Sequence, residues 1–129
     1  MKKILIYSET MLYLKGIDLL INEGIQDIKT NCANSVTTYK ELVSRQSYAL
    51  IILHIDFLGT TSKNQGKVIS LLPPQTPILI LTDDTVSAGK LFPSVVDHIC
   101  FLDVKNTATK IISMATSMLS MTKPNNTTT

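Results

Sequence analysis

The sequence alternates between short apolar runs and longer segments in which apolar residues recur at helical spacing. The first, third and fourth runs are nearly continuous in Ile and Leu, which is typical of strands covered on both faces. The second run alternates with polar residues, which favours a place nearer an edge of the sheet. The runs that predict strands are Lys3–Tyr7, Ile28–Cys32, Tyr48–His54, Pro77–Thr82 and His98–Leu102.

Helical periodicity fills the intervals between these runs. The first helix is expected to stop at Gly24, and the second to begin with Asn34 or Ser35 as its cap. Further helices are expected around Lys67–Leu72, Val86–Leu91 and Asn106–Met121. Strands that alternate with helices predict right-handed crossovers, and therefore an α/β protein with one doubly wound, five-stranded parallel sheet between two helical layers. In such sheets the functional residues lie beyond the carboxyl ends of the strands.

Length and composition fit one compact domain. The chain has 129 residues, of which 44% are hydrophobic and 17% charged, so it can bury a substantial core. Its net charge of +2 is too small to argue for nucleic-acid or membrane binding. We expect a domain over residues 1–121, followed by a polar tail or the start of an inter-domain linker over 122–129. No apolar run is long enough to cross a bilayer, and the first residues make a poor signal peptide, so a cytoplasmic protein is expected.

Candidate chemistry is sparse at the predicted strand ends. The loop Ser8-Glu9-Thr10 has no glycine and carries an acid that would repel phosphate, which argues against dinucleotide, P-loop and flavin sites. The two histidines, His54 and His98, lack the partners that a hydrolase or zinc site requires. The two cysteines, Cys32 and Cys100, are interpreted as small buried hydrophobes.

Acidic residues follow several of the predicted strands. Glu9, Asp56 and the pair Asp83-Asp84 could gather around the hydroxyl of Thr82 and bind Mg²⁺, which prefers oxygen ligands. Equally, these residues could be ordinary solvated acids of loops. The spacing alone leaves both interpretations open.

The sequence resembles the receiver domains of two-component response regulators, especially those of the LuxR/NarL class of transcription regulators. The resemblance covers roughly residues 3–121 and implies a flavodoxin-like (βα)₅ fold. Segment 5–17 looks like the opening L-I-V-D-D-H-P-L-F-R-E-G-L of that class, and segment 49–59 looks like D-V-V-L-L-D-I-x-M-P-G. Segments 77–82 and 99–103 look like P-V-I-V-L-T and Y-L-L-K-D.

The departures from this pattern concern the phosphorylation site. In the family, an aspartate that ends the third strand accepts phosphate from a histidine kinase, and His54 stands in its place. The acidic pair after the first strand is reduced to Ser8-Glu9, and the phosphate-binding lysine aligns with Leu102, with Lys105 nearby. The aromatic switch residue aligns with Ile99. Thr82, the hydroxyl that reports phosphorylation, is retained.

We therefore expect a degenerate receiver that works without phosphorylation, as a regulatory or dimerisation domain of a LuxR-type transcription regulator. No enzymatic activity, cofactor or Mg²⁺ is expected. If a metal ion were bound, Glu9 and Asp56 would be its ligands. The alternatives are a genuine receiver that uses Asp56 as acceptor and a domain that senses a small molecule.

The expected partners follow from the same resemblance. They are a second copy of the chain or another regulator, and no membrane contact is expected. DNA would be bound only by a helix-turn-helix domain that this sequence does not contain. The methionines of the last predicted helix could pack in the core or form an interface. They are Met114, Met118 and Met121.

Overall fold

The computed structural model describes residues 1–56, 63–90 and 98–120. Within these residues, five strands alternate with five helices. The strands are β1 (Lys2–Tyr7), β2 (Ile28–Ala33), β3 (Leu50–Ile55), β4 (Ile78–Thr82) and β5 (Ile99–Asp103). The helices are α1 (Met11–Gly24), α2 (Val36–Arg45), α3 (Lys63–Ser70), α4 (Thr85–Gly89) and α5 (Ala108–Ser120). This order confirms the alternation that the sequence predicts.

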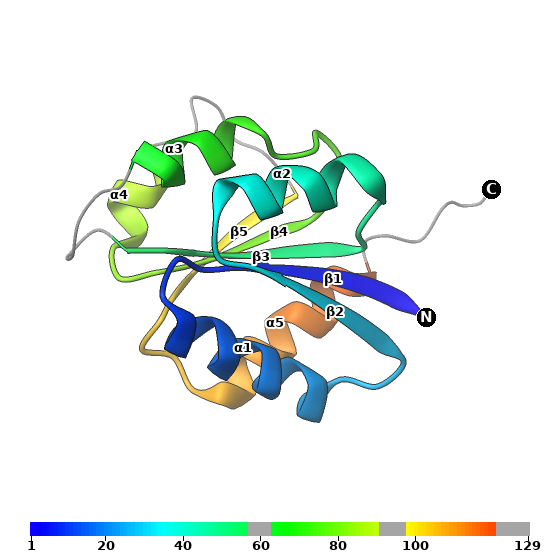
Figure 1. Cartoon of the computed structure of the whole chain (residues 1–129). Helices are drawn as coiled ribbons and strands as arrows, with labels where there is room; N and C mark the ends of the chain where they lie inside the picture. The colour runs from blue at the N-terminus through cyan, green and yellow to red at the C-terminus, as the bar shows by residue number, and fades with distance from the viewer. Residues whose placement is uncertain (57–62, 91–97, 121–129) are drawn as a thin grey trace.

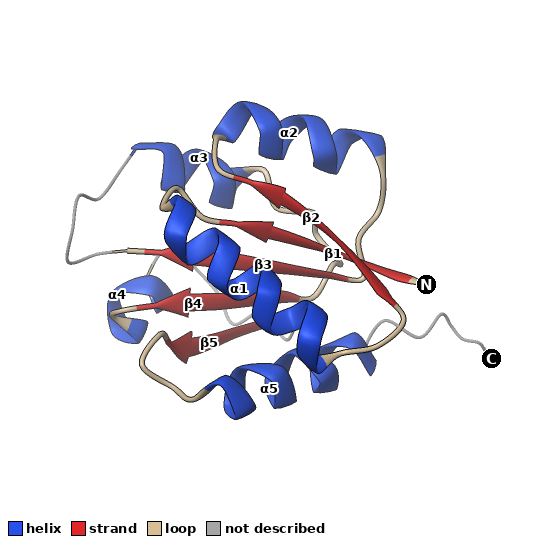
Figure 2. Ribbon diagram, turned by 60° about the horizontal axis from the view of Figure 1, so that its bottom comes forward, coloured by secondary structure: helices blue, strands red, loops and turns tan. Residues whose placement is uncertain are grey.

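The five strands form one parallel sheet in the order β2-β1-β3-β4-β5. Figure 1 shows α2, α3 and α4 on one face of the sheet and α1 and α5 on the other. Figure 2 shows all five arrows pointing the same way, with β2 and β5 at the two edges. The predicted three-layer, flavodoxin-like fold is confirmed, and so is the edge position of the second strand.

The core has two parts because each central strand is covered on both faces. One part packs between the sheet and helices α1 and α5, and the other between the sheet and helices α2, α3 and α4. Every residue of β3 and β4 is buried. A fully buried Ile or Leu contributes about 1.5–3 kcal/mol, so these strands hold the layers together.

Local sequence signals mark the start of α2 and the end of α1. The Ser35 hydroxyl accepts a hydrogen bond from the backbone N–H of Thr38 at 3.2 Å, which makes Ser35 the N-cap of α2. Helix α1 ends at Gly24 as predicted. Helix α3 begins at Lys63, earlier than predicted. The sequence pattern missed its first turn because that turn is polar and shows no apolar periodicity. Strand β3 is shifted by one residue at its end and runs through Ile55.

Two of the three candidate methionines, Met114 and Met118, lie on α5. Met118 is 1% exposed and packs with α1 and the sheet, so in this fold it serves the core and not an interface. Met114 is partly buried and packs against the same cluster. Met121 and the tail 122–129 lie outside the described residues.

The two cysteines are half-buried free thiols, less buried than the sequence predicts. They lie on β2 and β5, the two edge strands, which the helices cover less completely. Desolvation, together with Asp18, raises the pKa of Cys32 to about 11. This thiol therefore stays protonated and unreactive at neutral pH.

None of the described helices combines the length and the apolar character that crossing a bilayer requires.

Candidate functional site

The candidate site lies at the carboxyl ends of β1 and β3. The chain runs from β1 outward to β2 and then returns to β3, so the strand order reverses between β1 and β3. Ligands of doubly wound sheets bind at this switch point. The register pairs Tyr7 with Leu53, which places the next residues, Ser8 and His54, side by side at the switch.

His54 is held on three sides. Its side chain follows Leu50 and Ile52 on the sheet face that α1 and α5 cover, since alternate residues of a strand share a face. The imidazole stacks on Tyr13 of α1, with ring centroids 4.0 Å apart and planes 6° from parallel. A hydrogen bond of 2.9 Å joins His54 Nδ1 to Ser8 Oγ. We call Ser8, Tyr13 and His54 the His54 cluster.

Ser8 ties this cluster to the start of α1. The backbone N–H of Thr10 donates to Ser8 Oγ at 3.1 Å, and Thr10 is the N-cap residue of the helix that carries Tyr13. Ser8 is completely buried. The strand end, the loop and the first turn of α1 are thereby fixed relative to one another.

The cluster holds a neutral imidazole. His54 is 7% exposed, and this burial lowers its pKa below the ordinary value because a charged ring would lose its hydration. The carboxylates of Asp56 and Asp83 act in the opposite direction. Burial also raises the pKa of Tyr13, and Asp103, Asp56 and Asp83 add to that shift. At neutral pH, the stacked pair is therefore an uncharged imidazole on an uncharged, half-buried phenol.

The predicted acidic residues surround the cluster without forming one group. Asp56 and Asp83 are half-buried and near enough to influence His54. The Glu9 carboxylate accepts a 2.8 Å hydrogen bond from Tyr7, whose side chain packs on the opposite sheet face, in the core beneath α2. Asp84 caps α4, where its oxygens accept hydrogen bonds from the backbone N–H and hydroxyl of Ser87 at 3.0 and 2.7 Å. These bonds lower the pKa of Asp84.

The remaining predicted site residues have structural contacts. Thr82 is fully buried, and its hydroxyl oxygen accepts a hydrogen bond from the backbone N–H of Asp84 at 3.2 Å. Leu102, where the resemblance places a lysine, is buried in the core between the sheet and α1 and α5. Lys105 is exposed on the loop before α5, where its backbone N–H donates to Asp103 Oδ1 at 2.8 Å.

The donor set at the switch point fits Mg²⁺ poorly. Mg²⁺ requires hard oxygen ligands in near-octahedral geometry, but the position at the end of β3 offers an imidazole and the next position on β1 offers a hydroxyl. Glu9 already accepts the Tyr7 phenol. Within residues 1–56, 63–90 and 98–120, no three His, Cys, Asp or Glu side chains gather as metal ligands would.

Tyr13 is the site residue that sequence reasoning missed. The helical pattern assigns it only to the apolar face of the first helix. Its position in the first turn after β1 was the available signal, because that turn begins beside the carboxyl ends of the strands. A ring so placed can cover a side chain at the switch point.

Comparison with solved structures shows which proteins share this architecture. A receiver domain of a Francisella response regulator superposes with a TM-score of 0.71 at 18% identity, covering 95% of this chain and 100% of the other. A receiver-domain protein from Clostridium thermocellum gives 0.67 at 17% identity, covering 94% and 96%. A sensor protein from Polaromonas gives 0.72 at 14% identity, covering 93% and 97%.

The sequence itself matches no protein-family model. The search of curated proteins likewise finds no match. At these identities the structural likeness shows the fold alone. The role of each site residue must be argued from its own contacts and chemistry. The chain has the fold of response-regulator receiver domains.

Proposed function

We propose that this chain is a receiver-type regulatory domain that works without phosphorylation. The observation that carries the proposal is the His54 cluster at the switch point. The acceptor of a receiver domain is a carboxylate that the phosphodonor can reach, whereas His54 is an imidazole that is buried, stacked on Tyr13 and hydrogen-bonded to Ser8. An imidazole cannot form an aspartyl phosphate, so the central step of phosphorylation signalling is missing at this position.

The neighbouring positions support the same proposal. Binding a phosphoryl dianion depends on summed positive charge, from a metal ion and a lysine. Leu102 supplies no charge, and the carboxylate of Glu9 is engaged by Tyr7. We therefore propose that Mg²⁺ and other cofactors have no role and that the domain is not an enzyme. Its place in a LuxR-type transcription regulator, with DNA bound by a separate helix-turn-helix domain, is part of this proposal and rests on the sequence resemblance.

Incubation with acetyl phosphate and Mg²⁺, followed by intact mass spectrometry, tests the proposal. We expect the mass of the chain to stay unchanged, because no carboxylate occupies the acceptor position. A stoichiometric phosphoryl adduct would contradict the proposal. If Asp56→Asn abolished that adduct, Asp56 would be the acceptor and the chain a genuine receiver.

We further propose that the domain pairs with a second copy through α1 and α5. An apolar groove of about 360 Å³ lies there, lined by Leu12, Tyr13, Gly16, Ile17, Leu20 and Ile111. Leu12 stands at this groove with 85% of its surface exposed. A two-fold interface needs a patch that complements itself, and here a projecting leucine and a groove occupy the same patch.

Leu12→Asp is expected to abolish this pairing, because the interface would bury an unpaired carboxylate. Light scattering at micromolar concentration should give the mass of two chains for the native protein and of one chain for the variant. Leu19→Asp is the matched control, since Leu19 is exposed on the same helix without lining the groove. A monomeric native chain, or a dimer that persists in Leu12→Asp, would contradict this proposal.

A further inference from the structure

The surface over α2 and α3 is basic, although the chain as a whole is nearly neutral. Among the side chains that the structure describes, the two helices carry Lys40, Arg45 and Lys67 against a single acid, Glu41. The carboxyl edge of the sheet holds the opposite charge, with Glu9, Asp56, Asp83, Asp84 and Asp103 at the strand ends. Positive charge is therefore concentrated on one helical face.

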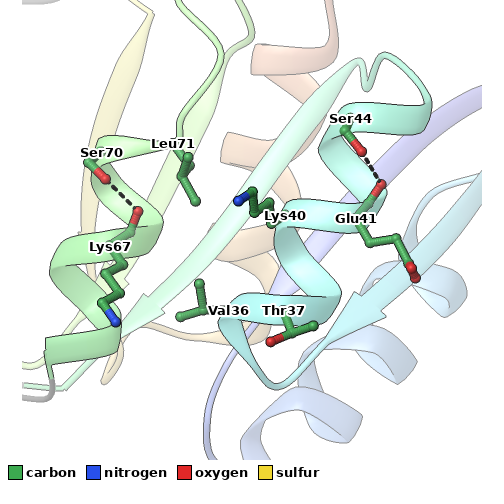
Figure 3. A pocket seen from close by; sticks show the side chains of 8 residues that line it. All are labelled: Val36, Thr37, Lys40, Glu41, Ser44, Lys67, Ser70 and Leu71. Carbon is green, nitrogen blue, oxygen red and sulfur yellow. Dashed lines mark hydrogen bonds between the residues drawn. The ribbon is translucent and has the colours of Figure 1, made fainter.

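A groove of about 710 Å³ runs between α2 and α3 on this basic face. Figure 3 shows side chains from both helices around it. Val36 and Leu71 give it an apolar surface, and Lys40 on α2 and Lys67 on α3 add one ammonium group from each side. The groove thus combines an apolar strip with a positive charge on either wall.

The Ser44 and Ser70 hydroxyls and the Glu41 carboxylate of the groove have partners within their own helices. The Ser44 hydroxyl donates to the Glu41 carbonyl oxygen at 2.8 Å, and the Ser70 hydroxyl donates to the Lys67 carbonyl oxygen at 2.7 Å (Figure 3). The Glu41 carboxylate lies 3.5 Å from Arg45 on its own helix. Among the described residues, no carboxylate lies within salt-bridge distance of Lys40 or Lys67. These two lysines are therefore the charges that the groove offers to a ligand.

The groove is open along its length, since all of its lining residues except Val36 are exposed. Small-molecule sites usually enclose most of the ligand surface, whereas an open groove suits a chain segment. We propose that this groove binds an acidic segment of a partner protein, with carboxylates beside Lys40 and Lys67 and an apolar side chain against Val36 and Leu71. Charge complementarity of this kind sets specificity and association rate. The proposal does not depend on the state of the His54 cluster, which lies on the other sheet face.

A titration of the full chain with a synthetic peptide of alternating Glu and Leu residues, followed by amide NMR, tests this proposal. We expect saturable shifts confined to α2, α3 and the residues that follow each helix. A peptide with Lys in place of Glu should produce no shifts there. Added salt should weaken the binding, because exposed charges are screened.

Charge-reversal variants distinguish binding at the groove from a general effect of the net charge of the chain. Lys40→Glu with Lys67→Glu should weaken peptide binding about tenfold or more. Lys15→Glu with Lys110→Glu changes the net charge equally but lies on α1 and α5, and should leave binding unchanged. Absence of saturable shifts on α2 and α3, shifts centred on another surface, or equal weakening in both double variants would overturn the proposal. None of these results would alter the outcome of the phosphorylation test.

Discussion

Replacing His54 with alanine is expected to lower the free energy of unfolding by about 2–4 kcal/mol. The substitution removes a buried ring from the centre of the sheet, and with it the stack on Tyr13 and the hydrogen bond to Ser8. The cavity left behind cannot close easily, because β1 and β3 fix its walls through their backbone pairing. Urea denaturation followed by far-ultraviolet circular dichroism measures the change.

His98→Ala is the matched control for this loss. His98 is half-buried in the turn before β5, and its backbone carbonyl oxygen, which the substitution keeps, accepts the N–H of Ile78. The control should change stability by no more than about 0.5 kcal/mol. If His54→Ala were equally mild, the His54 cluster would not be a structural unit, and the ring would be free for another role.

The stability of the chain is expected to fall as the pH drops below about 6.5, and His54 is the expected source. Its folded-state pKa lies below the ordinary histidine value because the ring is desolvated. Between the two pKa values the unfolded chain binds a proton that the folded chain does not, so acid favours unfolding. One such group contributes a slope of up to about 1.4 kcal/mol per pH unit within that window.

His54→Phe isolates this contribution, since phenylalanine keeps an aromatic ring beside Tyr13 and cannot be protonated. Urea midpoints measured from pH 8 to pH 5 should fall more steeply for the native chain than for the variant. Parallel curves would mean that His54 charges as readily when folded as when unfolded. The account of a neutral, desolvated imidazole would then be wrong.

The sequence predicts the fold well because the central strands carry an unusually plain signal. The runs that became β1, β3 and β4 are apolar on both faces, and such strands have one stable environment, the middle of a covered parallel sheet. Helix α3 was placed too late because its first turn, Lys63-Asn64-Gln65, shows no apolar period. The burial of Met118 depends on how α5 packs against α1, which the helical pattern alone does not determine.

The candidate site was predictable in position but not in its contacts. Parallel strands bring their carboxyl ends together, so Ser8, His54 and Thr82 could be assigned to one edge of the sheet. The stack of Tyr13 on His54 depends on the angle at which α1 leaves β1, and no local pattern encodes that angle. The hydrogen bond from Tyr7 to Glu9 likewise depends on the directions of the two side chains, which the sequence pattern does not determine.

These contacts give the switch point a different physical character from a phosphate site. The His54 cluster is uncharged at neutral pH and is joined by a hydrogen bond and a ring stack, while its acidic neighbours Asp56 and Asp83 lie around it. A phosphate site needs converging carboxylates for the metal and a lysine for the phosphoryl group. At the ends of β1 and β3, Ser8 and His54 are instead joined to each other by a hydrogen bond.

Mass spectrometry after treatment with acetyl phosphate and Mg²⁺ tests the central claim most directly, with the triple variant Ser8→Asp, His54→Asp and Leu102→Lys measured in parallel. The variant returns two carboxylates and a lysine to the positions that the family resemblance assigns them. We predict an unmodified native chain and a phosphoryl adduct on the folded variant. Phosphorylation of the native chain, at Asp56 or at any other carboxylate, would contradict the account.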